Sequence, residues 1–386
     1  MNKIKHNPMN KLPVITYRWL KLNDITLDIP FENNIIPYNK EYLKYNRNDT
    51  TRDNRIIIDK MNPSVLATYD SKARENDASL QTYKTSEYGV SKELVAECEN
   101  SYNSGLFIEL PEAITIDEPI RVEYSLDKSN PSVVDYNIIY AGAASKATIV
   151  IDYATEDQTE SYHNGAMKIY AKEGSDITIV KIQRMNDMSH HFDSHIAYVS
   201  PYARAKFIQI ELGSKHSVTN YIGSIKESGE ATISSIYFGD GTRLIDLSYH
   251  MKHIGRRSIS NIQTKGALKD YAVKTFRGTI DFEKGASQSD GSEEEYVILL
   301  DKNVTSNAIP LLLCSEDDVK GQHAASAGKV DSDKLFYMMS RGFTREEAMK
   351  MIVEASFQPI IEHIPFADLR QLISDDIHGR IINEKL

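Results

Sequence analysis

Residues 147–185 read ATIVIDYATEDQTESYHNGAMKIYAKEGSDITIVKIQRM. Three short runs stand out in this stretch, at 147–153, 167–171 and 176–185, and each is rich in β-branched or alternating apolar residues. Polar residues and a glycine separate the runs, which is typical of strands joined by turns. No amphipathic helix lies between them, so the pattern argues against a doubly wound sheet with helical crossovers.

Similar runs continue on both sides, from about residue 104 to about residue 285. A sandwich, a barrel and a solenoid all fit strands of this length. Turn-like glycines or polar pairs recur at steps of about ten residues over roughly 180 residues, which favours a repeating stack. We therefore expect a mainly β protein with a parallel β-helix core over residues 101–325. Such a core has open edge strands that suit partner binding.

The first region, residues 1–100, is polar and rich in Asn, Tyr and Lys. It is predicted to be helical or irregular, with one helix from Ser91 to Asn100. Trp19 is the only tryptophan in the chain. Because burial of a large aromatic ring removes much apolar area from water, Trp19 is interpreted as a packing anchor.

The last region, residues 326–386, carries readable helix signals. Asp331 is predicted to cap one helix, and Gly342 to provide its left-handed exit. Thr344 and Glu347 have the spacing of a capping box for the next helix, which Pro359 should kink or end. The pattern predicts a small helical domain after the β core.

The composition excludes several classes of protein. The net charge is −10, from 45 basic and 55 acidic residues, which disfavours nucleic acids and anionic membranes as partners. The two cysteines cannot build a disulfide framework, as expected of a cytoplasmic protein. No apolar run approaches the roughly 18 residues of a membrane span.

Two polar segments are open to a structural and a functional interpretation. His190, His191 and His195 could bind metal if they lay on a helix, but their surroundings are strand-like, which favours ordinary surface or turn histidines. The charge runs at 255–258 (GRRS) and 291–296 (GSEEEY) are interpreted as solvated turns.

Enzyme motifs are missing from the sequence: there is no P-loop, GxSxG, HExxH or CxxC. Asp317 and Asp318 form an acidic pair, but adjacent residues of an extended segment point to opposite faces, so they are expected to brace the structure. An enzyme that acts on polysaccharide, with Asp317, Asp318 and His323 as acid and base groups, is kept as an alternative.

Two residues near this pair are candidate ligands. Cys314 follows an apolar strand, where an inert buried thiol is the usual finding and a soft ligand for iron or sulfur species is the functional alternative. His323 is expected in a turn of small residues that leaves its imidazole accessible, which makes it the candidate metal ligand.

The segment from about 275 to 362 resembles the SufB/SufD family of iron–sulfur cluster assembly proteins. The motifs that carry the resemblance are TFRGTIDFEKGA at 275–286, Pro310, Asp317-Asp318-Val319, His323, Gly328 with Asp331, Leu335-Phe336-Tyr337, Ser340-Arg341-Gly342 and Glu346-Glu347-Ala348. SufB proteins carry a cysteine in a Cys-Gly-x-His context, and this chain lacks it. Within the family the chain is therefore most similar to SufD.

The resemblance implies a right-handed parallel β-helix between helical termini and a non-catalytic scaffold in a SUF complex. The expected partners are a SufB-like subunit, joined along strands near residues 265–315, and a SufC-like ABC ATPase. Phe336, Tyr337, Arg341 and Phe343 are expected to bind the ATPase. His323, with Cys314 as a second candidate, is expected to contact iron or a transient cluster at the subunit interface, with no tightly bound cofactor. A homodimer that acts alone is a further alternative.

Overall fold

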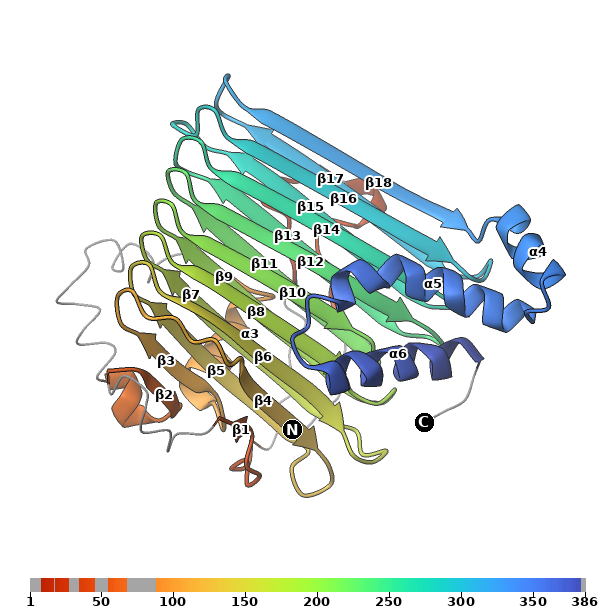
Figure 1. Ribbon diagram of the computed structural model, residues 1–386, viewed down its shortest axis with the longest axis horizontal. Coiled ribbons are helices and arrows are strands. Elements are labelled where there is room, and N and C mark those ends of the chain that lie inside the picture. Colours follow the sequence, from red (N-terminus) through yellow and green to blue (C-terminus); the bar gives the residue numbers. More distant parts are fainter. Residues whose placement is uncertain (1–7, 17, 28–34, 46–54, 68–87, 383–386) are drawn as a thin grey trace.

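Two long sheets lie face to face and form the body of the protein in the computed structural model (Figure 1). The structure describes residues 8–16, 18–27, 35–45, 55–67 and 88–382. From β3 onward the chain alternates between the sheets, so each turn of the stack contributes one strand to each. The predicted parallel β-helix is confirmed.

The first sheet has the strand order β1-β4-β6-β8-β10-β12-β14-β16-β18. Its strands are β1 (Leu43–Lys44), β4 (Ile120–Leu126), β6 (Lys146–Thr155), β8 (Asp176–Arg184), β10 (Arg204–Glu211), β12 (Glu230–Gly239), β14 (Ile259–Leu268), β16 (Asp290–Leu299) and β18 (Lys320–Lys329). The second sheet has the order β17-β15-β13-β11-β9-β7-β5-β3-β2. Its strands are β2 (Ile57–Lys60), β3 (Leu106–Leu110), β5 (Ser132–Ala141), β7 (Tyr162–Ala171), β9 (His190–Val199), β11 (His216–Ile225), β13 (Leu244–His253), β15 (Val273–Phe282) and β17 (Thr305–Cys314).

Successive turns stack in parallel register, as where Arg204 of β10 pairs with Glu230 of β12. Because side chains alternate along a strand, every second residue points into the space between the sheets, which we call the lumen. Side chains from both sheets fill the lumen, among them Ile151, Phe207 and Ile262 from the first sheet and Met167 and Leu247 from the second. The lumen is thus the main core of the protein.

The N-terminal region covers part of the outer face of the second sheet. Its helix, α3 (Lys92–Ser101), begins after the Ser91 cap, close to the predicted position. Cys98 of α3 is fully buried against the sheet, and its Sγ donates to the carbonyl of Asn164 at 3.3 Å. The packing role expected for Trp19 is wrong: Trp19 lies in the short 3-10 helix Arg18–Leu20 with its side chain 97% exposed.

The C-terminal region contains α4 (Ser332–Ser340), α5 (Arg345–Ile361) and α6 (Ala367–Ile382). The Asp331 cap, the left-handed Gly342 and the Thr344–Glu347 capping box are all present, and Pro359 lies in the last turn of α5. No helix of the described residues is long and apolar enough to cross a membrane.

Helices α5 and α6 lie across the outer face of the first sheet (Figure 1). Phe357 of α5 and Ile373 of α6 belong to one buried cluster with Ile208 and Phe238 of the sheet. The boundary expected at residue 325 falls inside β18, so the last strand extends further than the sequence suggested. The helices and the β-helix share a core.

Candidate functional site

The last turn of the β-helix is exposed. In the described part of the chain, β17 and β18 each pair with one strand of their own sheet, β15 and β16 respectively. Nearly every residue of β18 is exposed, on both faces of the strand. We call this last turn, residues 305–329, the open end.

His323 lies within β18 and not in the turn that its small neighbours suggested. The segment is a strand because β16 supplies a complete parallel ladder, and His323 is the register partner of Glu293. Glu293 in turn pairs with Ile262, which faces the lumen. Register partners on parallel strands share a face, so the exposed His323 side chain stands on the lumen side of the open end.

Cys314 is the last residue of β17, on the second sheet. The expected burial of its thiol is wrong: Cys314 is exposed, and its Sγ donates to the Glu316 carbonyl at 3.0 Å. Cys314 pairs with Phe282, whose side chain stacks on His253 inside the protein. Cys314 therefore also belongs to the lumen side of the open end, opposite the sheet that carries His323.

Asp317 and Asp318 lie in the turn between β17 and β18. The Asp318 carboxylate accepts a hydrogen bond from Ser287 Oγ at 3.3 Å, and its carbonyl accepts from the Gln288 amide at 2.5 Å. These contacts join the turn to the preceding turn of the stack, so Asp318 has the bracing role that the sequence predicts for the pair. His323 lies further on, within the strand.

One layer below His323, the lumen holds charged residues that sequence reasoning assigned to a solvated turn. Residues 291–296 belong to β16, and Glu293 and Glu295 are 3% and 2% exposed. Lys274 Nζ contacts Glu295 Oε1 at 2.6 Å, and Tyr237 donates to the same oxygen at 3.1 Å. Burial, reinforced by the neighbouring Glu295, raises the pKa of Glu293 to about 8.

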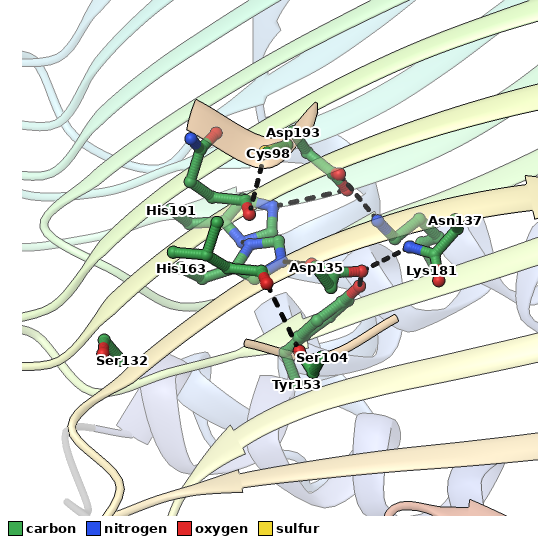
Figure 2. A network of polar contacts seen from close by, with 12 residues as sticks. Cys98, Ser104, Ser132, Asp135, Asn137, Tyr153, His163, Lys181, His191 and Asp193 are labelled. Carbon is green, nitrogen blue, oxygen red and sulfur yellow. Dashed lines mark hydrogen bonds and ion pairs between the residues drawn. The ribbon is translucent and has the colours of Figure 1, made fainter. Parts of the chain in front are cut away.

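A second polar cluster lies deeper in the stack (Figure 2). We call it the lumen network, made of Asp135 of β5, His163 of β7, Lys181 of β8, and His191 and Asp193 of β9. His163 Nε2 lies 2.7 Å from Asp135 Oδ1, and His163 Nδ1 lies 2.7 Å from His191 Nδ1. Lys181 Nζ lies 2.6 Å from Asp193 Oδ1. Each of these side chains is at most 1% exposed.

Electrostatics in the lumen network follow from burial and pairing. Burial alone would raise the pKa of Asp193, but His195 and Lys181 outweigh it and hold this pKa well below the usual range. Burial lowers the pKa of His191 well below its ordinary value, and the nearby His163 lowers it further. The network thus holds a paired lysine and carboxylate beside a neutral His191.

The histidines of β9 are buried, so their interpretation as surface or turn residues is wrong. The strand-like surroundings predicted for them are confirmed. In a strand, His191, Asp193 and His195 share one face because they are two residues apart. That alternation, combined with His163 one turn earlier in the register, was the signal for a buried cluster. Among the residues that the structure describes, no group of three or more His, Cys, Asp or Glu side chains is arranged to hold a metal.

The four residues expected to bind an ATPase all lie on or just after α4. Phe336, Tyr337 and Phe343 are 74%, 57% and 40% exposed. The Arg341 guanidinium lies 4.9 Å from the centre of the Tyr337 ring. Only Leu335 of α4 is buried. The helix and the residues just after it therefore present an aromatic surface and the Arg341 guanidinium to solvent.

Comparison with known proteins agrees with this architecture. A family model described as the SufBD core domain of SUF system FeS cluster assembly matches residues 124–356, more than half of the chain. The iron–sulfur cluster assembly protein SufD of Bacillus subtilis is 25% identical over 282 residues, which are 70% of this chain and 63% of that protein.

Two further relatives carry the family name. A SufBD family protein of Staphylococcus epidermidis is 24% identical over 81% of this chain and 68% of its own length. Another, from Mycobacterium leprae, is 27% identical over 71% of this chain, which is 32% of its own length. The matched region contains both the lumen network and the open end, and it makes this chain a member of the SufBD family of the SUF iron–sulfur cluster assembly system.

Proposed function

We propose that this chain is a SufD-like, non-catalytic scaffold subunit that works in the cytoplasm during iron–sulfur cluster assembly. The observation that carries the proposal is the open end, where an exposed strand presents His323 at a free sheet edge in a member of the SufBD family. The name of the B. subtilis relative supports the choice of SufD.

A SufB-like subunit is the proposed partner at the open end. Strands β17 and β18 expose backbone groups that an added strand can satisfy, and Leu312 is 40% exposed beside them. The interface should bury more than about 1,000 Å². The alternative is a homodimer that acts without SufB, and it would use the same strand edges.

Cys314 gives a direct test of this interface, because the only other cysteine, Cys98, is buried. Alkylation of Cys314 should be fast in the isolated chain and slow after mixing with a SufB-like partner, as measured by mass spectrometry. Protection at high concentration without the partner would indicate the homodimer. Alkylation that stays fast in every mixture would contradict an interface at the open end.

A SufC-like ABC ATPase is the proposed partner of α4. Phe336 and Tyr337 are neighbouring aromatic side chains that are both largely exposed. Exposed apolar residues that lie together are typical of a docking site, whereas single ones are common on any protein surface. The double variant Phe336→Asp with Tyr337→Asp should abolish co-purification of the ATPase. Tyr271→Asp is the matched control, since Tyr271 is 63% exposed in a different part of the chain. Equal co-purification by both variants would refute docking at α4.

His323 is proposed to bind or position iron or a nascent cluster as cargo, without holding the fold. His323→Ala should leave the free energy of unfolding within about 1 kcal/mol, as for other surface changes. It should nevertheless reduce cluster formation in the assembled complex, followed by visible absorbance under anaerobic conditions. Gln322→Ala, on the opposite face of the same strand, is the control. Normal cluster formation by His323→Ala would remove the ligand role.

A further inference from the structure

The carboxyl group of Glu293 has a buried oxygen atom without a hydrogen-bond partner among the described residues. Two glutamates of β16 point into the lumen, Glu293 and Glu295. Glu295 has a lysine and a tyrosine as partners. Glu293 is 3% exposed, yet its Oε2 has no hydrogen-bond partner among the described residues. A buried polar atom without a partner costs free energy, so this position calls for an explanation.

The surroundings of Glu293 are shaped around its carboxyl group. A Cβ atom added to Gly278 of β15 would lie 2.2 Å from the Glu293 carboxyl carbon. The side chain therefore crosses the lumen to the backbone of the second sheet, and glycine leaves the room for it. The carboxyl group lies under the last turn and not at the surface.

The layer above Glu293 is the open end. His323 is the register partner of Glu293, and Pro310 is the register partner of Gly278. In the next layer of the stack, His323 thus occupies the strand position directly above Glu293. The carboxyl is buried, whereas the imidazole is exposed at the end of the stack.

We propose that Glu293 and His323 together bind one ferrous ion at the open end, with Glu293 as the buried oxygen ligand and His323 as the exposed nitrogen ligand. Imidazole and carboxylate are a donor set that suits divalent iron. Water or a partner subunit would supply the remaining ligands. This inference rests on the proposed role of His323 and adds a residue that the exposed surface alone does not reveal.

The test uses the purified full chain under anaerobic conditions. Ferrous ion is titrated against a chromophoric chelator, with the wild type, Glu293→Gln, His323→Ala and the double variant. Each single variant should weaken iron binding at least tenfold. The iron affinity of the double variant should be close to that of the weaker-binding single variant, because both residues hold the same ion. Glu294→Gln is the matched control: Glu294 is the next residue of β16 and is exposed on the other face.

Fold integrity is checked by thermal unfolding of each variant, and a second measurement does not depend on affinity. Paramagnetic Co²⁺ should broaden the imidazole NMR signals of His323 in the wild type and leave them sharp in Glu293→Gln. Unchanged iron affinity in a folded Glu293→Gln chain would refute the proposal that Glu293 and His323 bind the same ion. Equal broadening of the His323 signals in both proteins would refute it as well.

Failure of the iron site and failure of the proposed scaffold function give different results. If iron binds through both residues but no SUF partner co-purifies, the site stands and the scaffold role fails. If partners co-purify and clusters form while Glu293→Gln binds iron normally, the scaffold role stands and Glu293 is no ligand.

Discussion

The two ends of the β-helix are finished in opposite ways. At the N-terminal end, β1 pairs antiparallel with β4, and β2 pairs antiparallel with β3. Tyr42 closes the lumen there, 4% exposed and stacked on Tyr124 at 4.8 Å. At the open end, β17 and β18 keep a free edge in the described structure. Natural sheets protect edges that must not pair, and the unprotected end is the one where we propose that a partner binds.

The same contrast applies to charge. The lumen network encloses its charges completely, whereas the open end places one histidine at the surface. Substitutions inside should therefore change stability, and substitutions at the open end should change binding.

The largest effect is expected from Lys181→Met. The change leaves Asp193 without its lysine partner in a fully buried site, and breaking such a pair from one side costs about 3–5 kcal/mol. Urea denaturation followed by circular dichroism measures the loss. Lys146→Met on the neighbouring strand is the control: Lys146 is 61% exposed and lies 3.9 Å from Asp176, so its loss should cost at most about 1 kcal/mol. Equal effects of the two changes would contradict the division.

A second effect concerns pH. Burial raises the pKa of Glu211 from 4.5 to about 7, although the hydrogen bonds from Ser217, Gln209 and Thr219 lower it. The folded chain thus keeps a proton that the unfolded chain releases near pH 4.5, and the free energy of unfolding falls as pH rises between these values. Between about pH 5 and 7.5 this group should remove about 2 kcal/mol of stability.

The comparison of wild type with Glu211→Gln isolates that contribution. The buried His191 acts with the opposite sign, because its lowered pKa makes the folded chain more stable as pH rises. Both proteins contain His191, so the difference between their stability curves should decline with pH. A difference that is constant from pH 5 to 7.5 would show that Glu211 has an ordinary pKa.

The two cysteines give a smaller contrast. Cys98→Ala removes a fully buried sulfur and its hydrogen bond to Asn164, which should cost about 1 kcal/mol or more. Cys314→Ala at the open end should change stability by less than about 0.5 kcal/mol. Thermal unfolding of the two variants side by side measures both values. A greater loss from Cys314→Ala would place that residue in the core.

The smallest effect is expected at Trp19. Because its side chain is 97% exposed, Trp19→Phe should change stability by less than about 0.5 kcal/mol. The fluorescence of this single tryptophan should already have a solvent-exposed emission maximum in the folded chain and shift little on unfolding. A large blue shift of the folded protein would mean that the ring is covered.

Much of this fold could be predicted because turn residues and β-branched runs repeat locally, and the helix caps at Asp331 and Thr344 depend on a few neighbouring residues. The site was harder. His163 and His191 meet because they are one turn apart in register, a distance along the chain that composition does not reveal. The small residues around His323 resemble a turn, but pairing with β16 imposes a strand. The packing role predicted for Trp19 was wrong because burial depends on what covers a side chain, and the size of the side chain does not determine that.

The open end also has a consequence for biosynthesis. Each turn of a solenoid contacts mainly its neighbours, so order spreads along the stack from turns already formed. The closing strands at Tyr42 leave the ribosome early, whereas β17 and β18 come last and need β15 and β16 as a template. A chain interrupted before residue 305 would lack both Cys314 and His323. The surface proposed to bind a partner can therefore form only after the preceding turns of the β-helix have been made and stacked.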